Sequence, residues 1–536
     1  MNTNVRIRAV SRVLLLCLCC ALTVGFEALT YAQEDDDLGE EDDKATGPRA
    51  GASSTEEEEE TAASPGSKPV PAAEAAAAKP PAVVAPPAPS PFQLVVKGLV
   101  SGSMFMQSVP TAPSGGSLAF ATNKGVPDGW FLGGDVRQTR LTFTIRGPEV
   151  LGGATPTGVA EMDLGGYNYQ FLAVGGLSAV IGTAGPMGTT VTVPVGFNVA
   201  TNESRFDENL VPRMRLAYVE LNWNNSQNVL RVGQYHNLLL GMIAGSASHI
   251  ALPLGYGAGQ LGWRSPGITY LHRFPLSMTS GLDIGFQINR NSWRDELPNC
   301  GPGQVAPQAQ CLPFGVSAGE ASMLPQVEAR IMAFGGMVEA PLPFYLPVKW
   351  LVYLAAHWDR KDLTGAGNAT LPTTTGVPYR DTMDTAVAQA GFKTQLGPVL
   401  VAANGWYGKN AGNVFGHIFQ MQNLNGSDVT GFGAWGQLAV GLTKNLSLWG
   451  FGGIDQPDEN QVRRAGSTFS LGGTTLIRNI QLMGQLAYTE GPIQIAAELM
   501  YVMTTSLVTP NPMMPAVRVA ELHNAVQPSV TLNYNF

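Results

Sequence analysis

The most constraining feature of the chain is its ending, VTLNYNF, in which the side chains alternate strictly. Apolar residues occupy every second position from Val530 to Phe536, and threonine or asparagine fills the positions between. A period of two is typical of a β-strand with two different faces. Chain ends usually fray, so a patterned last residue predicts that Phe536 is part of a sheet.

The same alternation recurs from residue 92 to the end, and short connections alternate with long ones. No run of about 18 apolar residues follows the first 32, so a membrane-spanning helix is not predicted. Hydrophobic residues make up 44% of the chain, charged residues only 14%, and glycines number 63. Low charge with alternating segments is typical of a transmembrane β-barrel. The sequence therefore predicts an all-β, antiparallel barrel that crosses a membrane.

We count about sixteen predicted strands, an even number that places both ends on the side of the short turns. In outer-membrane barrels that side is the periplasm. The last strand is expected to close the barrel beside the first, with Tyr534 and Phe536 facing lipid. The predicted strands are 93–106, 135–147, 157–166, 213–223, 228–236, 266–274, 281–290, 326–340, 348–359, 385–395, 399–408, 431–442, 446–455, 476–489, 493–504 and 524–536.

Three regions are predicted along the chain. Residues 1–32 combine arginines, an apolar stretch and a small-residue cleavage site, which is typical of a secretory signal peptide; a lipoprotein signal at Cys19 is the alternative. Residues 33–91 hold 14 acidic and four basic residues and many alanines and prolines, which predicts a disordered periplasmic arm. The arm is a solvated spacer or a tether to the cell wall. Residues 92–536 form the barrel.

Two cysteines lie in that barrel region, at the ends of a loop rich in Gly, Pro and Gln. In an oxidising compartment Cys300 and Cys311 predict one loop-closing disulfide, with two free thiols as the alternative. Residues 92–536 contain 26 acidic and 25 basic residues, so nucleic-acid binding is not indicated. Sequence motifs of hydrolases, metalloproteases and nucleotide-binding enzymes are absent, and six scattered histidines show no metal-ligand spacing. We therefore expect neither an enzyme nor a bound cofactor.

Alternation also predicts which charged side chains point into the lumen. Glu328, Asp359, Lys393 and Glu498 are among them. The candidates for selectivity are Arg140, Arg146, Glu161, Asp163, Arg213, Arg215, Arg330 and Lys349, together with Arg231, whose strand alternates poorly. Glu220 is out of phase with Arg213 and Arg215, which indicates a bulge or a rim position. Arginines inside a pore lower the barrier for anions. Alternatively, they pair with Glu161 and Asp163 and stiffen the wall.

The third long connection, which begins NLLLGMIAGSASHIALPLGYG after His236, is predicted to fold into the lumen and to narrow it. Its residues are small, and His249 is its titratable side chain. A lone histidine is usually a hydrogen-bonded packing residue, so a gating role is the weaker interpretation.

The stretch RMRLAYVELNWNNSQNVLRVGQYHNLLLGM resembles Gram-negative outer-membrane porins, in particular the trimeric DcaP-like group. The resemblance rests on Arg213, Arg215, Ala217 and Tyr218, and on Gly233 with Gln234 just before the narrowing loop, and RQTRLTFTIRGP and VAEMDLGG support it. It implies a homotrimer in the Gram-negative outer membrane. The acidic arm departs from the family, whose members carry a coiled-coil segment there.

These observations predict a porin that forms a water-filled channel for small hydrophilic solutes and favours anions such as dicarboxylates. Outer-membrane lipid, the barrel insertion machinery, which reads a terminal Phe, and a cell-wall contact through the arm are the other expected partners. The alternatives are a structural protein tethered to the cell wall and a transporter for hydrophobic compounds.

Overall fold

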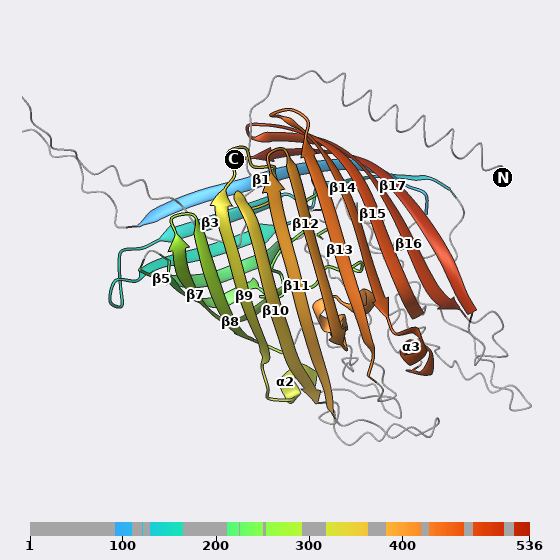
Figure 1. Ribbon diagram of the computed structural model, residues 1–536, viewed down its shortest axis with the longest axis horizontal. Coiled ribbons are helices and arrows are strands. Elements are labelled where there is room, and N and C mark those ends of the chain that lie inside the picture. Colours follow the sequence, from blue (N-terminus) through green and yellow to red (C-terminus); the bar gives the residue numbers. More distant parts are fainter. Residues whose placement is uncertain are drawn as a thin grey trace, which may run out of the picture.

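The computed structural model describes residues 92–109, 120–121, 129–164, 212–224, 226–249, 253–291, 318–362, 382–419, 428–465, 475–508 and 519–536. These residues form one antiparallel sheet that closes on itself as a barrel (Figure 1). The expected signal peptide, the acidic arm, and Cys300 with Cys311 and their disulfide all lie outside the described residues. No helix among the described residues is long and apolar enough to cross a membrane.

The sheet contains 17 strands in the described part of the chain. They are β1 (Gln93–Gln107), β2 (Phe131–Asp135), β3 (Arg140–Arg146), β4 (Thr155–Asp163), β5 (Arg213–Trp223), β6 (Asn228–His236), β7 (Arg264–Ser277), β8 (Ser280–Asn289), β9 (Gln326–Met337), β10 (Val348–Asp362), β11 (Thr382–Leu396), β12 (Val399–Lys409), β13 (Thr430–Gly441), β14 (Leu446–Pro457), β15 (Thr475–Glu490), β16 (Ile493–Val508) and β17 (Val519–Asn535).

Short helices stand between some strands on the side of the long connections. They are α2 (Ala318–Ala321), η2 (Ala411–Val414), η3 (His417–Phe419) and α3 (Glu459–Ala465).

Because β2 and β3 both pair with β1, one after the other, they fill a single place in the ring. The 17 strands therefore occupy sixteen places, which confirms the predicted count. Each strand predicted from the alternation is present.

The prediction missed β2, whose residues 131–134 it placed in a long connection, and it continued the next strand through residues 136–139, where a local hydrogen-bonded turn interrupts it. The backbone N–H of Arg137 donates to Asp135 Oδ1 at a distance of 2.9 Å. The Arg137 guanidinium donates two more hydrogen bonds to the same carboxylate. An aspartate that binds the backbone two residues on favours a turn over a continuous strand.

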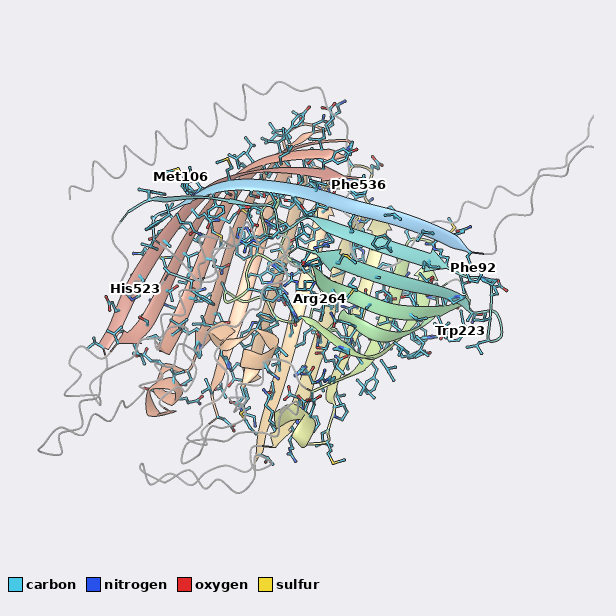
Figure 2. All side chains as sticks on the ribbon, turned by 180° about the vertical axis from the view of Figure 1, so that it is seen from behind. Phe92, Met106, Trp223, Arg264, His523 and Phe536 are labelled. Atoms are coloured by element: carbon cyan, nitrogen blue, oxygen red, sulfur yellow. The ribbon has the colours of Figure 1, made fainter. Side chains whose placement is uncertain are left out.

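The barrel closes between β1 and β17, as the ending of the chain predicted. Leu99 pairs with Asn535, and Gly98 exchanges both backbone hydrogen bonds with Phe536 at 2.9 Å. Figure 2 shows Phe536 lying along β1. The rings of Tyr534 and Phe536 stack on the outer surface, where both are about half exposed. Closure leaves no free sheet edge, which a lipid environment requires.

Alternation sorts side chains into an outer and an inner set. On β10, the outward residues Trp350, Val352, Leu354 and Trp358 are between 37% and 62% exposed. The inward residues of the same strand are Leu351, Tyr353, Ala355, His357 and Asp359, and all of them are buried. An apolar outer band of this kind is the surface that contacts acyl chains.

The position of Glu220 is resolved by a bulge in β5. The register with β4 shifts between Glu161 and Met162, so that Arg215 and Leu216 both turn inward. Beyond the bulge the alternation is reversed, which brings Glu220 to the inner face.

Gly98 tests the closure directly, because a Cβ there would lie 2.3 Å from the Phe536 ring. We expect Gly98→Ala to destabilise the folded barrel by roughly 1–3 kcal/mol, the usual cost of overpacking. Gly102→Ala on the same strand is the matched control, since its Cβ would meet nothing within 4 Å. Heat-modifiable migration and urea unfolding measure the effect; equal stability of the two variants would contradict this closure.

Candidate functional site

A row of charged side chains crosses the inner face of β3, β4 and β5. Arg140, Asp163 and Arg213 are direct neighbours across the three strands. Arg213 holds Asp163 with two hydrogen bonds, Nε to Oδ1 at 3.0 Å and Nη2 to Oδ2 at 2.6 Å. Such bidentate arginine–carboxylate pairs are strong and fix orientation.

Arg215 links the two acidic residues of this row. Its Nε donates to Glu161 Oε1 at 2.5 Å and its Nη1 to Asp163 Oδ2 at 2.9 Å. Arg215 is the extra residue at the bulge of β5, next to Leu216, which pairs with Glu161. Arg140 Nε lies 3.5 Å from Glu161 Oε1. Arg146 shares the inner face of β3 and lies nearer the short-turn end, beside Thr157.

A further arginine, Arg264, joins the row from the start of β7, inside the barrel (Figure 2). Its guanidinium lies 4.2 Å from the ring centroid of Trp263, and that of Arg213 lies 5.9 Å from the same ring. Its Nη1 is buried without a hydrogen-bond partner among the described residues. We call Arg140, Arg146, Arg213, Arg215 and Arg264, with Glu161 and Asp163, the basic wall. It holds five guanidinium groups and two carboxylates.

The other predicted lumen residues lie apart from the basic wall. Arg231 points inward, pairs with Glu220 and lies 4.1 Å from the Tyr235 ring centroid. Arg330 is buried on the inner face of β9. Lys349 is exposed at the start of β10, at the short-turn end of the barrel. The structure therefore brings five of the nine charged candidates for selectivity into contact, places Arg146 at the other end of β3, and leaves these three elsewhere.

The described part of the connection between β6 and β7, residues 237–249 and 253–263, crosses the lumen; we call it the constriction segment. Its backbone is held by inward amide side chains of the opposite wall. Gln437 makes two hydrogen bonds to the backbone of Gly245, at 2.8 and 2.7 Å, and Gln485 accepts from Ala247 N at 2.8 Å. These side chains, which we call the amide ladder, are Gln437, Asn479, Gln481, Gln485 and Asn533.

Apolar packing closes the space between the constriction segment and β10–β15. The segment contributes Leu239, Met242 and Leu254 to one buried cluster. The inner wall contributes the large side chains Tyr353, Trp406, Trp435, Trp449, Phe451 and Met483. This part of the lumen is therefore a packed core and not an open passage.

The linker between β9 and β10 adds to this packing from the short-turn end. Phe344 and Tyr345 are buried against Trp449, with ring centroids 5.2 and 6.2 Å away. Phe344 also touches Gly245, where a Cβ would lie 2.5 Å from the Phe344 Cβ. The constriction segment thus reaches through the lumen to this linker.

A charged cluster on β9 and β10 anchors the start of the constriction segment. His357 lies between two carboxylates, with Nδ1 2.8 Å from Glu328 Oε1 and Nε2 2.7 Å from Asp359 Oδ2. Glu328 also accepts from Asn237 Nδ2 at 2.8 Å and Leu239 N at 3.2 Å. The segment is therefore fixed where it leaves β6.

His249 lies beside two serines and a glutamate, but they do not form a catalytic triad. Ser248 Oγ and Glu498 Oε1 both lie near the same ring nitrogen, Nδ1, at 2.9 and 3.0 Å. A triad needs the serine on one nitrogen and the carboxylate on the other. Among the residues that the structure describes, no group of three or more histidine, cysteine or acidic side chains is placed to hold a metal ion.

Comparison with solved structures finds this barrel in outer-membrane channels. The outer membrane channel DcaP of Acinetobacter baumannii covers 84% of this chain and 99% of its own, with a TM-score of 0.52 and 14% sequence identity. The fold is that of an outer-membrane porin.

An anion-selective porin from Comamonas acidovorans covers 83% of this chain and 100% of its own, with a TM-score of 0.44 and 11% identity. OprB of Pseudomonas putida covers 83% and 94%, with a TM-score of 0.41 and 8% identity. No protein-family model matches this sequence, and no curated protein matches it. The likeness to the DcaP channel concerns the fold, as the sequence resemblance had predicted.

The sequence reasoning missed Arg264 and the amide ladder. Arg264 stands two residues before the predicted strand 266–274, so it was assigned to a loop. The ladder residues were recognisable as polar side chains at inward positions. Their partners were not, because the backbone that they bind lies up to 286 residues away in the chain.

Asp163 is the shared partner of two arginines, so its loss is expected to be costly. Removing one partner of a buried ion pair typically destabilises a protein by about 3–5 kcal/mol. We expect Asp163→Asn to lower the urea unfolding midpoint accordingly. Asp384→Asn is the control, because the Asp384–Arg360 pair has the same geometry and is exposed; a loss no larger than that of the control would contradict the role of Asp163.

Proposed function

We propose that this chain is an outer-membrane porin that passes small hydrophilic solutes by diffusion and favours anions such as dicarboxylates. The observation that carries the proposal is the basic wall, in which five guanidinium groups face two carboxylates. Arginine offers a fixed fork of donors that matches carboxylates, so two of these groups can be spanned by a dianion.

The exposure of the inner wall indicates where a solute would pass. The inward side chains of β3, from Arg140 to Arg146, are partly exposed, whereas those of β12 are buried. With the β10–β15 side packed, the remaining passage runs between the constriction segment and the basic wall. A passing anion would meet Arg140, Arg146 and Arg213, which are partly exposed, whereas Arg215 and Arg264 are buried behind them.

This arrangement unites the two interpretations of the arginines. Arg213 and Arg215 are paired with Asp163 and Glu161, as a stiffening role requires. Arg264 has a buried donor without a partner among the described residues. The arginines of the wall are therefore not all neutralised by its two carboxylates. Selectivity then rests on the excess of arginines over carboxylates in the basic wall.

Reversal potentials across planar bilayers test the anion preference. We expect ohmic single-channel steps from the wild type. Replacing Arg140 and Arg264 together by alanine should lower the anion-over-cation permeability ratio by roughly threefold or more, because two positive charges leave the pore. Arg290→Ala is the control, since Arg290 pairs with Glu320 at the exposed outer end of β8.

An unchanged ratio in the double variant would make the arginines scaffold and not selectivity residues. An absence of single-channel steps in the wild type would contradict the porin proposal itself.

We also propose a homotrimer, on the resemblance to the DcaP-like group alone; crosslinking in detergent that stops at the monomer would count against it.

A further inference from the structure

The turn of the constriction segment at residues 245–249, which we call the tip, is fastened to one acidic residue of the far wall. Ser246 Oγ and Ser248 Oγ each donate to a different oxygen of Glu498, both at 2.7 Å. His249 Nδ1 lies 3.0 Å from Glu498 Oε1. Each of these side chains is buried, and Glu498 stands on the inner face of β16.

Glu498 is a charged group in surroundings that are otherwise neutral. Its inward neighbours are Gln485 on β15, Ser529 on β17, and Ala496 and Met500 along β16, and none of them carries a charge. A buried carboxylate is costly unless hydrogen bonds satisfy it. Every hydrogen bond that the structure gives to this carboxylate comes from the tip. Its charge is therefore used to hold the tip, and the pore arginines are not among its partners.

The tip is otherwise held by neutral hydrogen bonds from four side chains, and Gln437 binds both backbone groups of Gly245. Gln485 accepts from Ala247 N at 2.8 Å, and Asn533 Nδ2 donates to Ala247 O at 3.0 Å. Gln138, in the break between β2 and β3, donates to Ser248 O. Hydrogen bonds to a charged group are roughly twice as strong as neutral ones. The Glu498 contacts are thus the strongest part of the attachment.

We propose that Glu498 is a positioning residue of the pore. It holds the tip against β15–β17 and thereby fixes the cross-section that the constriction segment leaves open beside the basic wall. This inference rests on the proposed porin function. When Glu498 is removed, two serine hydroxyls and an imidazole lose their acceptor, and the tip leaves the wall. The space that the tip vacates beside β15–β17 then becomes a second route across the lumen, and the arginines act on a smaller share of the ions that cross.

Two measurements on Glu498→Ala test the proposal. We expect the single-channel conductance to rise and the anion-over-cation ratio to fall by roughly twofold, because ions that cross beside β16 do not pass the arginines. Glu498→Gln, which keeps one carbonyl acceptor, should give an intermediate value. The triple variant Ser246→Ala, Ser248→Ala, His249→Ala should reproduce Glu498→Ala, and combining all four changes should add nothing further. Thr531→Val is the control, because it removes a buried hydroxyl of β17 that bonds to Ser103.

The position of the tip is measured independently of conduction. Ala247 is 1% exposed, so a cysteine placed there, with Cys300 and Cys311 replaced by serine, should resist a thiol reagent. Labelling should become at least about tenfold faster when Glu498→Ala is added, because a detached tip is solvent-accessible. The triple variant gives the same labelling test if Glu498→Ala does not fold.

Unchanged labelling together with unchanged conductance would overturn the positioning role. Faster labelling after Glu498→Ala, in a protein whose wild type never conducts, would support the attachment and count against the porin function, so the two proposals fail separately.

Discussion

The structure depends on the closure of the sheet between β1 and β17. Inside a bilayer no water is present to satisfy backbone N–H and C=O groups, so a sheet that spans it must have no free edge. Gly98 and Phe536 exchange the last pair of backbone hydrogen bonds at this seam. Once the ring is closed, the period of two leaves each side chain either on the lipid surface or in the lumen. The exposed outer residues of β10 and its buried inner residues are the direct result.

Closure also means that any segment inside the lumen must find hydrogen-bond partners there. A segment that enters the barrel brings its backbone polar groups into a place shielded from solvent, where each needs a partner. The amide ladder supplies those partners on one side, and Glu498 binds the hydroxyls of the tip. Large apolar residues such as Trp435 and Trp449 fill the remaining volume. The lumen thereby acquires two different halves, a packed core along β10–β15 and a charged, partly exposed wall along β3–β5.

The sequence predicts the fold well because strand alternation is a local property. The sixteen places of the ring, the inward direction of Arg213 and the displacement of Glu220 all follow from period two. The break between β2 and β3 was missed because a local side-chain turn at Asp135 overrides the strand pattern. The site was predicted only in part. Arg264 becomes a wall residue through contacts with Trp263 and Arg213, and pairing across the lumen leaves no periodic signal in the sequence.

The measurement that most directly tests this account is quenching of tryptophan fluorescence by brominated lipids, in variants that each retain one tryptophan. Trp358 is on the outer surface of β10, and Trp435 is buried on the inner face of β13. The account predicts strong quenching of Trp358 and almost none of Trp435. Equal quenching of both, or quenching of Trp435 alone, would contradict a closed barrel with its apolar surface in lipid and its packed core inside.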